Sequence, residues 1–279
     1  MSIIGFWGTV HGQVSTTSNV IAISTMLALE NQIKTMITQT QSSHSTLESS
    51  LVKGTNDGGL LTFSDTGLDA LERLARSNRL TPDKVSDYTL SLLKGRLELL
   101  AGAVRPDAST FDNISEVIDL ILAVAKECYE LCFIDAHSGT KNDITKRVLK
   151  ESDLIVVNLN QNIHVLNRFF QKDDYLSELD SKPYIIVISQ YDPKSHLTVK
   201  NIQRKYKCKA PIFTVPYNTN FRDACNQQNV MEYFLRARNF TKKHPDYFFV
   251  NEIRKIANAI VKQTLPELAK NNEITKGVS

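Results

Sequence analysis

The residues best suited to chemistry follow the first apolar run of the chain. That run ends at Trp7 and a segment with helical spacing begins near Thr17, so the turn between them reads GTVHGQVSTT. In an α/β protein, the backbone amides of such a turn and the positive end of the next helix bind phosphate whatever the side chains are. Thr16 and Thr17 add hydroxyl groups of the kind that hold Mg²⁺. A plain strand-to-helix turn capped by Ser15 or Thr16 explains the same residues equally well.

A second candidate is the acid that ends a buried run later in the chain. The stretch YELCFIDAHSG has the form of a strand ending in Asp135, followed by a turn closed at Gly139. A Walker B strand delivers its carboxylate to Mg²⁺ beside a phosphate loop in this way. We therefore predict Thr16 and Asp135 as the residues nearest a bound Mg²⁺.

Short apolar runs predict the strands that position these residues. The runs lack in-and-out alternation, which is typical of a parallel sheet covered on both faces. Segments with helical spacing separate them, and this succession predicts a doubly wound, mostly parallel α/β fold. The expected strands are residues 3–7, 33–38, 97–101, 131–134, 154–158, 184–189 and 212–215, and the expected helices are 17–29, 68–74, 85–93, 114–128 and 250–265.

We interpret residues 1–279 as one domain. A helical insertion is expected at about 65–95, and the segment 39–65, rich in Ser, Thr, Asn and Gly, is expected to be a loop. The helix at about 250–265 places Ile253, Ile256 and Ile260 on one side. Because this stripe is narrow and has no Trp or Phe, we expect the helix to pack on the sheet rather than to bind a membrane directly.

Several long stretches resemble the MinD/ParA family of deviant Walker A P-loop ATPases, over nearly the whole chain. The resemblance is closest to the divergent branch of the TadZ and CpaE proteins of Flp/Tad pilus assembly. The stretches that carry it are FWGTVHGQVSTTSNVIAIS, FSDTGLDALERL, IDAHSGTKND, DLIVVNLNQN and VPYNTNFRDACNQ.

The resemblance implies a P-loop NTPase fold that binds ATP or ADP with Mg²⁺ and acts as a homodimer with protein partners. It places the phosphates at the first loop and the base at the ends of the last two strands. The residues implied at the phosphates are Val10, His11, Gly12, Gln13, Val14, Ser15, Thr16 and Thr17, and those implied at the base are Gln190, Tyr191, Pro216, Tyr217 and Asn218. A proline-initiated turn with Tyr217 packed on the core is an equally good interpretation of the last segment.

The sequence departs from an active member of that family at two places. Matched from the TT end of the loop, Val10 and Ser15 occupy the positions of the family's two lysines, and no lysine precedes Lys34. Losing a group that stabilises transition-state charge commonly slows catalysis by about 10² to 10³. The family's water-positioning aspartate is also missing, since no carboxylate lies between residues 36 and 47 and the only ionisable group there is His44. We therefore expect weak hydrolysis or none, and no catalytic residue is assigned.

Charge is divided unevenly along the chain. The formal net charge is +3, but residues 1–140 carry −6 and residues 141–279 carry +9. The segment 194–209 contains six Lys or Arg residues and no acid. It is either a solvated helix face or a contact surface for DNA or anionic lipid. With no secretory leader, no long apolar span and four unpaired-looking cysteines, we expect a cytoplasmic protein with reduced thiols.

Three functions are consistent with these features. The first is a degenerate nucleotide-binding protein that acts as a dimeric assembly or positioning factor, by resemblance for a Tad-like pilus or secretion system. The second is an active ParA-type ATPase that partitions cargo on DNA. The third is a scaffold whose nucleotide pocket stays empty.

Overall fold

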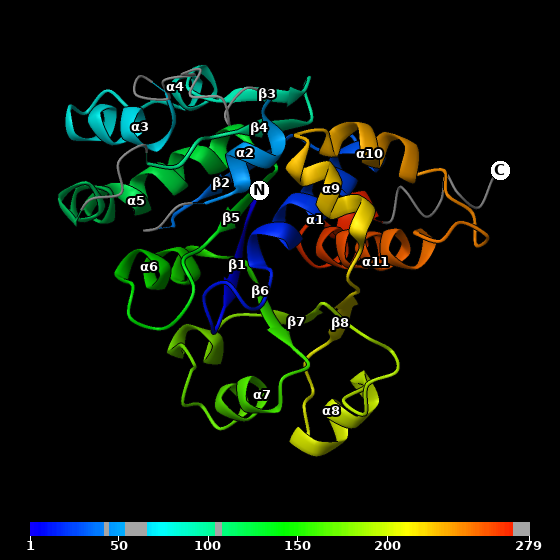
Figure 1. Cartoon of the computed structure of the whole chain (residues 1–279). Helices are drawn as coiled ribbons and strands as arrows, with labels where there is room; N and C mark the ends of the chain where they lie inside the picture. The colour runs from blue at the N-terminus through cyan, green and yellow to red at the C-terminus, as the bar shows by residue number, and fades with distance from the viewer. Residues whose placement is uncertain (42–44, 54–65, 104–107, 270–279) are drawn as a thin grey trace.

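A single eight-stranded sheet forms the centre of the molecule (Figure 1). The computed structural model describes residues 1–41, 45–53, 66–103 and 108–269. The strand order is β3-β4-β2-β5-β1-β6-β7-β8, and every neighbouring pair is parallel except β3 and β4. The strands are β1 Ser2–Gly8, β2 Thr35–Gln39, β3 Leu90–Leu93, β4 Leu97–Leu99, β5 Leu131–Asp135, β6 Leu154–Asn160, β7 Tyr184–Ser189 and β8 Ile212–Val215.

Helices cover both faces of this sheet, which confirms the predicted doubly wound α/β fold. Successive residues of one strand enter different cores: Ile4 packs with α1, α10 and α11, whereas Ile3 packs with α3 and α5. The helices are α1 Thr16–Glu30, α2 Leu47–Leu51, α3 Gly67–Arg76, α4 Pro82–Asp87, α5 Ala108–Cys128, α6 Asp143–Glu151, α7 Ile163–Phe170, α8 Val199–Tyr206, α9 Thr219–Asn226, α10 Val230–Ala237 and α11 Tyr247–Thr264, with a short 3₁₀ helix at Ser177–Asp180.

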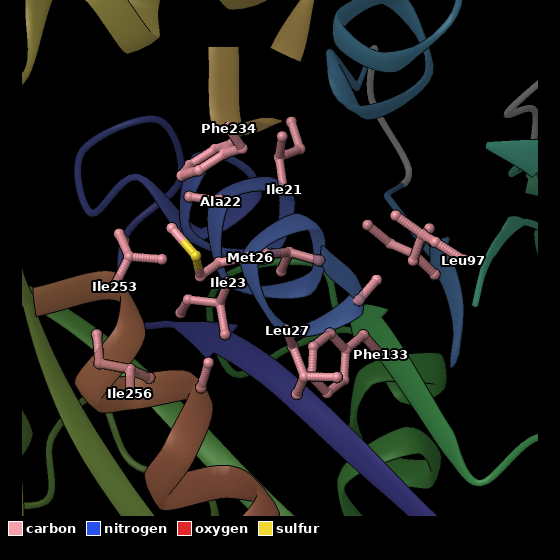
Figure 2. Packing of buried hydrophobic residues seen from close by; sticks show 14 of the residues in the cluster. Ile21, Ala22, Ile23, Met26, Leu27, Leu97, Phe133, Phe234, Ile253 and Ile256 are labelled. Carbon is pink, nitrogen blue, oxygen red and sulfur yellow. The ribbon is translucent and has the colours of Figure 1, made fainter. Parts of the chain in front are cut away.

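Helix α1 is buried on nearly every side. Figure 2 shows Ile23 and Met26 among side chains from α11, while Phe234 of α10 and Phe133 of β5 close other sides of the helix. Small or polar residues such as Ser24 and Thr25 are also buried. Because α1 is enclosed, its N-terminus is held in a fixed position at the end of β1.

The direction in which successive strands are added to the sheet reverses beside β1. The connection that leaves β1 runs through α1 to β2 on one side, and the connection that leaves β5 runs through α6 to β6 on the other. In open α/β sheets, ligands bind outside the carboxyl ends of the strands at such a reversal. The loop after Gly8 and the residue Asp135 both lie at this place.

Two expectations about local structure were wrong. Residues 85–93 do not form a helix: α4 ends at Asp87, and β3 pairs antiparallel with β4 across a turn with Gly95 at φ 69°. The segment 39–65 is not loop throughout, because β2 includes Gln39 and α2 occupies Leu47–Leu51. His44 lies outside the described residues.

The C-terminal helix packs as the sequence predicts. Ile253, Ile256 and Ile260 of α11 are fully buried in the core that contains α1 and β8. The four cysteines are free thiols. Among the described residues, no helix combines the length and the apolar character that crossing a membrane requires.

Candidate functional site

The loop between β1 and α1 presents backbone amides at a helix N-terminus. The first hydrogen bond of α1 joins the Asn19 amide to the Ser15 carbonyl at 3.0 Å, so the amides of Thr16, Thr17 and Ser18 have no acceptor within the helix. The positive end of a 15-residue helix adds to their attraction for an anion. Ser15 adopts φ 55° and ψ 32°, a left-handed conformation that turns the chain into the helix.

Buried polar side chains hold this loop in place. Asn19 of α1 donates to Asn158 at 2.7 Å and to the hydroxyl of Ser189 at 2.8 Å. The Ser189 hydroxyl in turn donates to the carbonyl of Val14 at 2.7 Å. Asn160 donates to the Gln13 carbonyl at 3.2 Å. The ends of β6 and β7 therefore bind the carbonyl groups of the loop and leave the amides at the start of α1 for a ligand.

Apolar side chains in the loop pack on the core. Val14 is buried, and a Cβ atom at Gly8 would overlap its side chain, so the loop closes over a position that only glycine fits. Val10 packs against the cluster that contains Trp7 and lies outside the cavity described below. At one of the two positions where the resemblance expects a lysine, the side chain therefore points toward apolar core rather than toward phosphate.

Asp135 ends β5 as predicted and is completely buried. Its Oδ2 accepts from the Thr17 hydroxyl at 2.6 Å and its Oδ1 accepts from Nε2 of Gln41 at 3.2 Å. Burial raises the pKa of this carboxyl to about 7, although both hydrogen bonds act to lower it. Thr17, not Thr16, thus contacts the acid, while the buried hydroxyl of Thr16 has no partner among the described residues.

Two histidines lie beside this acid. The rings of His11 and His137 stack with centroids 5.7 Å apart, and His137 Nδ1 lies 3.2 Å from Oε1 of Gln41. Desolvation, followed by the nearby His11, lowers the pKa of His137. The His137 ring is therefore favoured in the neutral form at neutral pH.

Two adjoining cavities lie at the N-terminus of α1. A cavity of about 250 Å³ is lined by His11, Gly12 and Val14 to Ser18 of the loop and by Gln41 and Ser138. A second, of about 230 Å³, extends to Pro216 and the start of α9. Five residues line both, and these mark the junction: Ser15, Ser18, Thr46, Gln190 and Arg222.

The structure brings most of the predicted site residues to these cavities. His11, Gly12, Val14, Ser15, Thr16 and Thr17 line the first, whereas Gln190, Pro216, Tyr217 and Asn218 line the second and Gln190 lines both. Val10, Gln13, Tyr191 and Asp135 are not among the lining residues.

The residues predicted to bind the base differ in whether their side chains are available to contact a ligand. Tyr217 is 55% exposed, so it does not pack on the core as the alternative interpretation required. The side chain of Asn218 is already used: it caps α9 by accepting from the Phe221 amide at 2.7 Å and donates to Asp246 at 2.8 Å. Tyr191 packs against the cluster beneath β7 instead of entering a cavity.

Sequence reasoning missed three residues near the site. Arg222 of α9 lines both cavities, Gln41 bonds Asp135, and Glu48 of α2 accepts from Gln39 at 3.1 Å and from the Gly102 amide at 2.9 Å. Arg222 was contained in the stretch VPYNTNFRDACNQ, but no pattern distinguished it from a solvated helix residue. The basic segment 194–209 is exposed at each of its Lys and Arg side chains and contributes no residue to either cavity.

Comparisons with known proteins agree with this geometry at the level of the fold. No family model matches the sequence, and no curated protein matches it. Solved structures do match over nearly the whole chain: a ParA family ATPase from Chlorobium tepidum superimposes with a TM-score of 0.70 at 14% identity, covering 92% of this chain and 97% of the other. This chain has the fold of the ParA and MinD ATPases.

Two further structures with the ParA/MinD fold contain a bound nucleotide. The septum site-determining protein MinD from Pyrococcus horikoshii, in complex with Mg-ADP, has a TM-score of 0.67 at 14% identity, with 94% of this chain and 97% of that chain covered. A plasmid partition protein from Borrelia burgdorferi bound to AMPPNP has a TM-score of 0.64 at 14% identity, with coverages of 94% and 99%.

The side-chain oxygens at this place fit Mg²⁺ only if phosphate oxygens supply further ligands. Among the described residues, no group of three or more His, Cys, Asp or Glu side chains is arranged to hold a metal. Mg²⁺ is usually bound through one or two carboxylates, waters and substrate phosphates rather than by a protein cage. The unpartnered hydroxyl of Thr16 and the carboxylate of Asp135 behind Thr17 are the oxygens available for such a shared site.

Proposed function

We propose that this protein is a nucleotide-binding assembly or positioning factor of the ParA/MinD type that hydrolyses ATP slowly or not at all. One observation carries the proposal: two adjoining cavities join the amides at the start of α1 to the turn at Pro216. The cavity at the loop is suited to the phosphates of a nucleotide, and the cavity that extends to Pro216 is suited to its base. Mg²⁺ bound with the phosphates would add positive charge that offsets theirs, with Thr16 and Asp135 nearest to it.

The side chains present support a proposal of nucleotide binding with slow or absent turnover. The loop keeps its amides and a fixed conformation, which suffice to hold a diphosphate. It has no lysine to stabilise the charge of a transferring phosphoryl group. The nearest acid after β2 is Glu48, and its Oε1 atom is already occupied by two donors. We therefore assign no general base and no catalytic residue.

Calorimetry with ATP and ADP in the presence of Mg²⁺ tests the binding half of this proposal. Ser18 is exposed at the N-terminus of α1 and lines both cavities, so Ser18→Trp should fill their junction without disturbing the core. Binding should be lost in Ser18→Trp and kept in Ser77→Trp, a matched change at an exposed serine that ends α3. Equal affinity in both variants would place the nucleotide elsewhere, and no heat with the wild type would favour the empty scaffold.

Partner recruitment is the second half of the proposal. By the resemblance, the protein acts as a homodimer in the cytoplasm and recruits components of a Tad-like pilus or secretion system. Light scattering with and without nucleotide should give twice the monomer mass in at least one state. A monomer at every nucleotide concentration would exclude the dimeric form of the proposal.

A DNA-partitioning ATPase is the second candidate, and the exposed basic residues of segment 194–209 favour it. Phosphate release measured with and without DNA separates the two functions. The positioning factor predicts no stimulation, whereas turnover that rises with DNA would replace it with the partitioning ATPase.

A further inference from the structure

Arg222 occupies the junction of the two cavities. It lies on the first turns of α9, whose N-terminus is fixed by the Asn218 cap and the bond from Asn218 to Asp246. Its guanidinium carbon is 5.5 Å from the centroid of the exposed Tyr217 ring, a distance typical of a cation–π contact. Within the part of the chain that the structure describes, the guanidinium has no hydrogen bond and no ion pair.

Among the described residues, the lining of the cavities offers this cation no counter-charge. Their lining consists of hydroxyl, amide and apolar side chains, His11 and Arg222, with no Asp, Glu or Lys among the described residues. An arginine that points into a polar cavity without a carboxylate partner is suited to a planar oxyanion such as a phosphate, which its fork-shaped donors bind in pairs. The positions where the resemblance expects lysines carry Val10 and Ser15 instead.

The place of Arg222 indicates which phosphate it meets. Ser15, Ser18 and Gln190 share the junction with it, between the amides of the loop and the turn at Pro216. A nucleotide laid across both cavities puts its inner phosphates at this junction and its outermost phosphate further along the loop toward His11 and Ser138. A cation at the junction therefore contributes equally to ADP and ATP.

We infer that Arg222 supplies the positive charge that the loop lacks and makes this site one for nucleoside diphosphates, with little preference for a third phosphate. The inference rests on the proposed function, because it assumes that the cavities hold a nucleotide. It adds the class of ligand and names a residue of α9, outside the loop, that would select this ligand.

Calorimetry of ADP, ATP and adenosine with the wild type and with Arg222→Gln tests the inference. Wild-type affinities for ADP and ATP should agree within about threefold, and Arg222→Gln should weaken both by about 10- to 100-fold, the effect of removing one charged hydrogen-bonding partner. Adenosine affinity should not change, and Arg222→Lys should recover part of the loss. Lys200→Gln, an equal change of net charge on exposed α8, is the control and should bind like the wild type.

The outcomes separate this inference from the proposed function. Nucleotide binding that is equal in the wild type and Arg222→Gln would overturn the role of Arg222 and leave the proposed function intact. ATP bound more than about threefold tighter than ADP would overturn the claim that the site has little preference for a third phosphate. Failure of the wild type to bind either nucleotide would remove the proposed function, and the inference with it.

Discussion

Asp135 is a carboxyl whose charge depends on what occupies the site. It is fully buried, and its hydrogen-bond donors are the neutral groups of Thr17 and Gln41. Burial raises its pKa to about 7, so in the absence of a cation the group is about half protonated near neutral pH. A divalent ion bound with phosphates would favour the ionised form, which couples metal binding to release of a proton.

The substitution Asp135→Asn should stabilise the empty protein more at high pH than at low pH. The raised pKa means that, between about pH 4 and pH 7, the folded chain holds a proton that the unfolded chain has lost. The free energy of unfolding of the wild type therefore falls as pH rises through this window and stays low above it. The variant lacks this titration, and its advantage should grow by about 3 kcal/mol from pH 4.5 to pH 8.

Thermal unfolding at several pH values measures this difference. Parallel curves for the wild type and Asp135→Asn would show that the carboxyl keeps an ordinary pKa. The same variant should lose the Mg²⁺ dependence of nucleotide binding while keeping its fold.

Candidate site residues that directly follow a strand could be predicted from the sequence. Those whose position depends on a local backbone angle or on another element could not. The loop from His11 to Thr17, Asp135 and Pro216 are marked by the apolar runs that precede them. Gln190 has φ 51°, and the residue after this left-handed turn, Tyr191, packs away from the cavity; no sequence pattern gives that angle. Arg222 enters because Asn218 fixes how α9 begins, which depends on a bond to distant Asp246.

At the scale of elements, the N-terminus of α1 depends on Asn19. This side chain is 1% exposed and joins α1 to β6 and β7 through Asn158 and Ser189. Asn19→Ala should lower the free energy of unfolding by about 2 kcal/mol, because buried acceptors lose their donor. Ser189→Ala should also destabilise the fold, since the Val14 carbonyl loses its partner.

A double-mutant cycle by urea unfolding separates the shared contribution of Asn19 and Ser189. The two substitutions together should cost about 1 kcal/mol less than the sum of the single changes, because they act in one network. Additive effects would mean that Asn19 and Ser189 support the loop independently.

Glu48 of helix α2 serves as a hydrogen-bond acceptor within the fold. Its Oε1 accepts from the buried amide of Gly102 and from Gln39, which ends β2. Glu48→Ala should cost about 1 to 3 kcal/mol because it leaves a buried amide without an acceptor, whereas Glu48→Gln keeps the acceptor and should cost less than about 1 kcal/mol. Chemical denaturation measures both. A larger loss of unfolding free energy in Glu48→Gln would show that the negative charge of Glu48, rather than its acceptor oxygen, stabilises the fold.

The strand that sequence reasoning missed is β3. Its four residues, Leu90–Leu93, are too short for periodicity to separate strand from helix. It forms because Gly95 allows a tight turn back along β4, and the resulting pair lies at the edge of the sheet. The other seven strands were predicted because a sheet covered on both faces needs continuous apolar strands.

At the level of the whole molecule, the basic segment 194–209 is separate from the two cavities at the N-terminus of α1. The cation-rich segment 194–209 lines neither cavity, and Lys200, Arg204 and Lys205 are exposed on α8. Changing these three residues to Gln should leave ADP affinity within about twofold of the wild type. It should also abolish any salt-dependent binding to DNA or anionic vesicles.

Calorimetry and a vesicle or DNA binding assay check the two parts of this prediction. A large loss of nucleotide affinity in the triple variant would show that α8 communicates with the cavities. Unchanged DNA or vesicle binding, with the same salt dependence, would exclude segment 194–209 as the contact surface.

The proposed function combines nucleotide binding with hydrolysis that is slow or absent. The most direct test is to incubate the protein with ATP and Mg²⁺ for an hour, separate it from free nucleotide, and identify what remains bound by chromatography. We expect nucleotide to be retained and most of it to be intact ATP. Recovery of no nucleotide, or of ADP in place of most of the added ATP, would contradict the proposed function.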